Sequence, residues 1–86
     1  MELSHFRALQ AAKLVELKRK LTAAYPDAKQ RVEHIVSLLI AKLEYLRTTT
    51  LADYLLTVSL ASREFPEFEE LMPDVETVKS LFERSS

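Results

Sequence analysis

Few residues of this sequence combine the types and the spacing that catalysis or metal binding requires. The two histidines, His5 and His34, have no carboxylate or hydroxyl partner at a spacing that makes a recognisable catalytic dyad. Ser4 adjoins His5, but adjacent residues on a helix point in different directions. The three glutamates within residues 67–70 match neither a calcium-binding EF-hand loop nor a helical Glu-x-x-His motif. We therefore expect no catalytic residue and no metal site, and we interpret these glutamates as a solvated edge.

Glycine and cysteine are both absent from the sequence. Without glycine the chain has no phosphate-binding loop, no dinucleotide fingerprint and no nucleophile elbow. Without cysteine it has no disulfide, no thiolate metal site and no cysteine nucleophile. We therefore expect a protein that is not an enzyme and needs no cofactor. An enzyme with an unrecognised carboxylate site is the remote alternative.

Length and composition predict one globular domain over residues 1–86. The 86 residues are 48% hydrophobic and 29% charged, proportions typical of a folded chain rather than a disordered one. No apolar run reaches the roughly 18 residues that a transmembrane helix needs, and no signal-peptide pattern opens the sequence. We expect a soluble, cytoplasmic protein with no membrane contact.

Prolines and small polar residues divide the sequence into four helical stretches, at about 4–24, 27–47, 50–64 and 74–83. The fold class that we expect is all-α: a small antiparallel bundle of about four helices, with a short extra helical turn near 67–72 between two prolines. Each stretch opens on a side chain that can cap a helix N-terminus. The candidate caps are Ser4, Asp27 with Gln30, Thr50 with Asp53, and Asp74.

Each of the first three helices has an apolar stripe at helical spacing, which we expect in the core. The stripes are Phe6, Leu14, Leu17, Leu21 and Ala24; then Val32, Ile35, Val36, Leu39, Leu43 and Leu46; then Leu51, Tyr54, Leu55, Val58 and Phe65.

The second and third helices also carry apolar residues on their opposite faces. On the third helix these are Leu56 and Leu60, with Ala52 on the same face. An apolar side chain left exposed forgoes roughly 1.5–3 kcal/mol, so several together indicate a covered surface. The first and fourth helices cover them, or a partner does. We expect a partner: a larger protein or a second copy of the chain, with His34 as an interfacial or half-buried ring. The expected partner-binding residues are His34, Leu38, Ala41, Tyr45, Leu56 and Leu60.

Charge is divided unevenly along the chain. Residues 1–47 carry nine basic and five acidic side chains, a net charge of +4, whereas residues 48–86 carry three and eight, a net charge of −5. The two halves attract each other within one bundle, or the basic half contacts nucleic acid. The second alternative makes the protein an accessory factor of a replication or transcription complex. The basic residues of the first helix flank its apolar stripe instead of gathering on one exposed face, which weakens the nucleic-acid hypothesis. The candidate contacts are Lys13, Lys18, Arg19, Lys20, Lys29 and Arg31.

The segment 65–73 places Phe65, Phe68, Leu71 and Met72 among acidic residues. Short acidic segments with such apolar residues can dock into a groove on another protein. They can equally fold back as a lid over the open end of a bundle. The spacing does not separate the two alternatives.

Overall fold

Helices are the only regular elements in residues 1–84, the part of the chain that the computed structural model describes. The predicted all-α fold class is confirmed, and so is the short extra turn, which is a 3₁₀ helix. The α-helices are α1 (Leu3–Ala24), α2 (Lys29–Glu44), α3 (Thr48–Glu64) and α4 (Val75–Arg84), and the 3₁₀ helices are η1 (Pro26–Ala28) and η2 (Pro66–Leu71).

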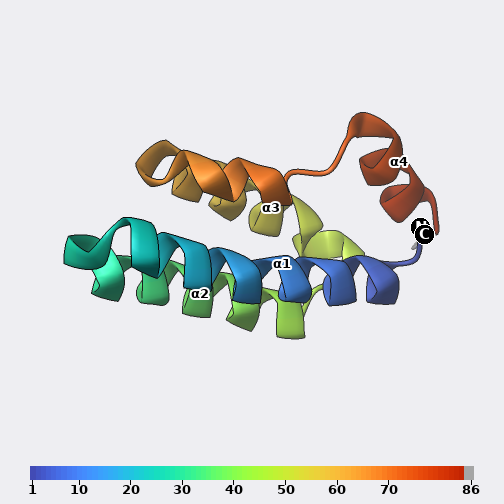
Figure 1. Cartoon of the computed structure of the whole chain (residues 1–86). Coiled ribbons are helices and arrows are strands. Elements are labelled where there is room, and N and C mark those ends of the chain that lie inside the picture. Colours follow the sequence, from blue (N-terminus) through green and yellow to red (C-terminus); the bar gives the residue numbers. More distant parts are fainter. Residues whose placement is uncertain (85–86) are drawn as a thin grey trace.

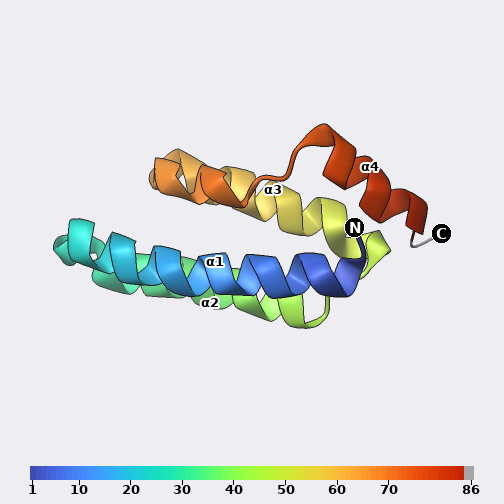
Figure 2. The same ribbon diagram turned by 45° about the vertical axis from the view of Figure 1, so that its right-hand side comes forward.

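The three long helices run side by side, and α4 lies across one end of them. Figure 1 shows α1 and α2 as an antiparallel pair with α3 above it, and the turned view in Figure 2 shows the same layering. The short α4 packs near the start of α1, where the amino group of Met1 donates a hydrogen bond to Ser80 Oγ at 2.6 Å. The fourth helix therefore closes an end of the bundle and leaves the length of α2 and α3 uncovered.

Two of the predicted helix starts are wrong, because local hydrogen bonding moves them. Pro26 opens a 3₁₀ turn that includes Asp27, so α2 begins only at Lys29 and no side chain caps it. Thr50 is the third residue of α3, and its Oγ1 accepts a hydrogen bond from the Arg47 N–H at 2.9 Å. This bond is one half of a capping box, so the chain enters α3 three residues earlier than predicted.

Two of the remaining helix ends also differ from the predictions, and one predicted cap is confirmed. Ser4 lies inside α1, which begins at Leu3 after Glu2, and α2 ends at Glu44 instead of residue 47. Asp74 caps α4 as predicted: its Oδ1 accepts a hydrogen bond from the Thr77 N–H at 2.7 Å. That bond lowers the pKa of the Asp74 carboxyl, because it stabilises the ionised form.

The predicted apolar stripes form the core, with two exceptions. Ala24 is exposed at the last residue of α1, where the chain turns into η1, and Leu55 is half-buried. All other members of the three stripes are buried, together with Phe68, Leu71 and Leu81. The period of 3.6 residues therefore identified the inner face of each long helix.

One polar chain crosses this core and connects three elements. Gln10 is only 3% exposed, and its Oε1 accepts a hydrogen bond of 2.6 Å from the Tyr54 hydroxyl on α3. Its Nε2 donates to the Leu71 carbonyl of η2 at 2.9 Å. Both ends of the amide are therefore satisfied inside the core. Burial raises the pKa of Tyr54, so the hydroxyl keeps its proton and remains a donor.

The segment 65–73 is a lid. Phe65, Phe68 and Leu71 are buried against the bundle. The rings of Tyr25 and Phe65 meet edge to face with centroids 5.3 Å apart, and those of Phe65 and Phe68 are 6.2 Å apart. Three of its four apolar residues are thus used within the chain, while Met72 is 36% exposed, which favours the lid over the docking segment.

Candidate protein-binding surface on α2 and α3

All six predicted partner-binding residues lie exposed on one side of the molecule. Leu38 is 43% exposed, Tyr45 77%, Leu56 59% and Leu60 51%, and His34 and Ala41 are exposed as well. The core lies behind α2 and α3, and α4 sits at the end of the bundle, so no described element covers them. We call the surface made by His34, Leu38, Ala41, Tyr45, Ala52, Leu56 and Leu60 the α2–α3 face.

Helix geometry explains why these side chains share one face. At about 100° per residue, the α2 members fall within an arc of about 60°, opposite the buried Val36 and Leu43. The α3 members fall within an arc of about 80°, opposite the buried Val58. Because the buried sides of both helices point to the same core, the exposed ridges both point away from it. Leu38 of α2 and Leu60 of α3 line the same hollow, so the two ridges adjoin there.

A shallow cleft runs between the two ridges and consists of two hollows that share Leu38. One has a volume of about 290 Å³, and the other of about 430 Å³. Residues Leu38, Ala41, Lys42, Tyr45, Thr50 and Asp53 line the first, and Arg31, Ile35, Leu38, Thr57, Leu60, Ala61, Arg63 and Glu64 line the second. Four of the six predicted residues thus line the cleft, while His34 and Leu56 are exposed but do not line it.

Two ion pairs cross this cleft, one toward each end. Lys42 Nζ lies 2.6 Å from Asp53 Oδ2, and Arg31 donates two hydrogen bonds of 2.8 Å to the two carboxylate oxygens of Glu64. The bonds from Arg31 lower the pKa of Glu64, so this pair stays charged. Of the residues that line the two hollows, Arg63 is the only charged one outside these pairs.

The ion pairs also fix the register of the two helices. Eleven residues separate Arg31 from Lys42 along α2, and eleven separate Glu64 from Asp53 in the opposite direction along α3. The helices therefore keep a constant antiparallel register between the two pairs. Counting four residues from the Lys42–Asp53 pair places Leu38 level with Thr57. Leu56 precedes Thr57 by one residue and Leu60 follows it by three, so the three leucines lie within about one helical turn along the helices.

Three of the six candidate nucleic-acid contacts are bound to other groups of the chain. Arg31 is bound to Glu64, Arg19 is paired with Glu16 on α1, and Lys13 Nζ donates to the Glu70 carbonyl at 3.3 Å. The bond from Arg19 lowers the pKa of Glu16, and the field of Lys20 lowers it slightly further. The remaining candidates, Lys18, Lys20 and Lys29, are exposed.

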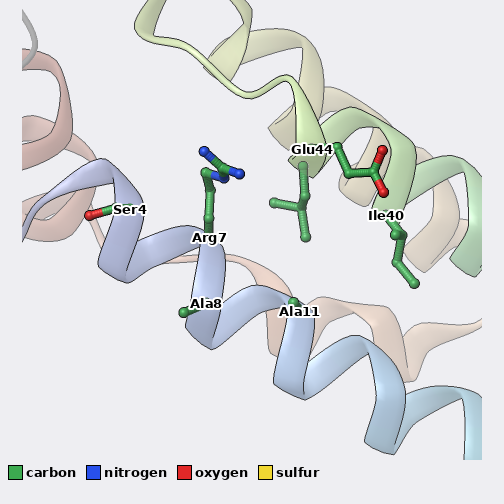
Figure 3. A pocket seen from close by; sticks show the side chains of 7 residues that line it. Ser4, Arg7, Ala8, Ala11, Ile40 and Glu44 are labelled. Atoms are coloured by element: carbon green, nitrogen blue, oxygen red, sulfur yellow. The ribbon is translucent and has the colours of Figure 1, made fainter.

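A hollow of about 480 Å³ lies on the other side of α2, against α1 (Figure 3). Ala8 and Ala11 of α1 and Ile40 of α2 contribute apolar carbon to it, while Arg7 and Glu44 project from the two helices that bound it. It contains no histidine and no cysteine. Across the described residues, no group of three or more His, Cys, Asp or Glu side chains could hold a metal ion.

Sequence reasoning missed Gln10, the polar residue at the centre of the core. The available signal was its position, four residues after Phe6 and four before Leu14 on the same stripe.

No described helix combines the length and the apolar character that crossing a membrane requires. No protein-family description, no curated protein and no solved structure matches this chain. Inference about its function therefore rests on the geometry of its surfaces.

Proposed function

We propose that this protein is a non-catalytic interaction or accessory subunit that binds a protein partner through the α2–α3 face. The observation that carries the proposal is a contiguous exposed surface with four large apolar side chains, Leu38, Tyr45, Leu56 and Leu60. The core of a protein interface is depleted of charge and enriched in apolar and aromatic residues. The seven residues of this face include no Asp, Glu, Lys or Arg, and the Arg31–Glu64 and Lys42–Asp53 pairs in the cleft beside them are closed within the chain.

The exposed side of α1 is the internal contrast. It carries Arg7, Glu16, Lys18, Arg19 and Lys20, and its two large exposed apolar residues, Leu9 and Val15, lie apart among them. Scattered apolar residues among charges are normal on a monomer surface and need no partner. Two adjacent helices with leucines on their outer ridges differ from that pattern. Because Leu38 is 43% and Tyr45 77% exposed, with Leu56 and Leu60 between them, burying the rest of each side chain contributes part of the roughly 1.5–3 kcal/mol of full burial, which favours association.

Tyr45 supports a protein partner over a small molecule. It is the most exposed of the four large residues and stands at one end of the cleft, beside Thr50. Tyrosine is among the residues that contribute most to protein interfaces, because its ring supplies apolar area and its hydroxyl a hydrogen bond. The cleft is open along its length, whereas small-molecule sites enclose most of their ligand.

Co-purification from the native source tests the proposal. A tagged wild-type chain, a Leu38→Ser/Leu56→Ser variant and a Val15→Ser control are each used to capture partners, which are identified by mass. We expect the wild type and the control to retain the same partner and the double variant to lose it. The double variant should keep its helical circular dichroism. Loss of helicity would show that Leu38 and Leu56 belong to the core, and an unchanged partner would place binding elsewhere.

A further inference from the structure

We infer that the occupant of the α2–α3 face is a second copy of this chain, related to the first by a two-fold axis over Leu38, Leu56 and Leu60. This inference rests on the proposed function of the face and specifies its partner. In this arrangement α2 and α3 of one copy pack face to face on α2 and α3 of the other, which gives two layers of two helices each. Three observations carry it: the charge balance of the face, the position of its leucines and its dimensions.

The charge balance of the face favours a copy over a strongly charged partner. The Arg31–Glu64 and Lys42–Asp53 pairs are each closed within the chain, which leaves Arg63 as the one unpaired charge lining the cleft. A strongly acidic or basic partner would find no complementary field there. When the face meets its own copy, the unpaired like charges that the two clefts bring together are one Arg63 from each copy, so repulsion across an isologous interface is small.

The position of the leucines suits a two-fold axis. The register set by the two ion pairs places Leu38 on one side of the cleft at a level between Leu56 and Leu60 on the other, so the three leucines lie within about one helical turn along the helices. Leu38 and Leu60 both line the same hollow and thus lie nearest its midline. An axis through this level places the three leucines of one copy on the three of the other. The result is a central group of six leucines, the kind of apolar core found in homodimer interfaces.

The dimensions of the face suit a reversible dimer. From Arg31 to Tyr45, α2 extends about 21 Å, and two helices side by side are about 20 Å wide. The footprint is roughly 400 Å², and the accessible area of a corrugated helix surface exceeds its footprint. This footprint is below the roughly 600 Å² per partner that the smallest stable interfaces bury, which is the range of weak, transient complexes. We therefore expect a dimer that dissociates at micromolar concentrations.

Sedimentation over a concentration series tests the assembly. The wild-type chain should move from the mass of one chain, 9.9 kDa, toward twice that value as its concentration rises through the micromolar range. Leu56→Glu places two carboxylates beside each other at the axis and should weaken the dimer at least roughly 100-fold. Val15→Glu adds the same charge on α1, at a residue 66% exposed, and should leave the dimer unchanged. Circular dichroism of each variant confirms that it is folded.

Single cysteines locate the axis, because the natural sequence has none and every disulfide reports the introduced position. Under diamide, which takes up the two electrons and two protons released by two thiols, Leu60→Cys or Leu38→Cys should link two copies. Val15→Cys should not. A chain that stays monomeric throughout the series, or one whose dimer withstands Leu56→Glu, overturns the inference. If such a chain still captures a partner that Leu38→Ser/Leu56→Ser loses, the proposed function stands and only the second copy is refuted.

Discussion

Replacing Tyr54 by phenylalanine tests the buried polar chain that joins α1, α3 and η2. The substitution keeps the ring, its place in the core and its edge-to-face contact with Phe6, whose centroid lies 6.3 Å away. It removes only the hydroxyl that donates to Gln10 Oε1 at 2.6 Å. Gln10 still donates to the Leu71 carbonyl, so its amide is held in place with one oxygen unpaired.

The expected cost follows from the burial of that oxygen. Leaving a buried acceptor unsatisfied costs about 1–3 kcal/mol, which is more than the net value of a typical hydrogen bond. For a domain of this size, 1 kcal/mol shifts the melting temperature by about 4–8 °C. We therefore expect Tyr54→Phe to lower the free energy of unfolding by about 2 kcal/mol and the melting temperature by about 8–16 °C.

Urea denaturation followed by circular dichroism measures this change in the free energy of unfolding. If the slope of that free energy against urea concentration is the same as in the wild type, only the stability has changed. A second variant, Tyr54→Phe/Gln10→Met, removes the stranded oxygen as well. Because that penalty disappears, the double variant should be more stable than the sum of the two single substitutions predicts, by about 1 kcal/mol. A Tyr54→Phe protein within about 0.5 kcal/mol of the wild type, or strictly additive effects, would refute the reasoning.

Two further predictions concern the cap of α4 and the basic residues of α1. The hydrogen bond from the Thr77 N–H lowers the pKa of Asp74 in the folded protein. The cap therefore stabilises α4 fully at pH values above the pKa that Asp74 has in the unfolded chain. This stabilisation is lost as the pH falls through the lower pKa that Asp74 has in the folded chain. The Thr77 amide proton should follow this titration in NMR spectra, and in Asp74→Asn it should not. We also expect no tight duplex DNA binding at about 150 mM salt, where affinity falls with a slope of about −0.9 per phosphate contact. Tight binding that disappears when Lys18, Arg19 and Lys20 are changed to Gln would contradict this expectation.

The sequence alone determined the helices, their inner faces and the exposed apolar ridges. These features follow from local rules: proline ends a helix, and the period of 3.6 residues sorts side chains to opposite sides. Leu38 and Leu56 could be assigned to an outer face because their positions on the helix are set by the buried residues around them. The cap of α4 was equally local, since Asp74 and Thr77 lie three residues apart.

The start of each helix depended on which of several possible local hydrogen bonds forms. The spacing of capping residues in the sequence does not tell which of these bonds is the most stable. Asp27 has the pattern of a cap, yet Pro26 draws it into a 3₁₀ turn. Thr50 also has a capping side chain, but its hydroxyl binds the Arg47 N–H and thereby places the start of α3 earlier. Residues of the same type can act as the cap or as its reciprocal partner, and the backbone conformation selects between these roles.

Tertiary structure alone decided which surfaces are covered. The sequence left open whether the fourth helix shields Leu38 and Leu56, and only the packing of α4 across one end leaves them exposed. The burial of Gln10 and the pairing of Arg31 with Glu64 likewise depend on residues 61 and 33 positions away. The periodicity of one helix defines its faces, but which neighbour meets each face depends on how the connecting segments bring distant helices together.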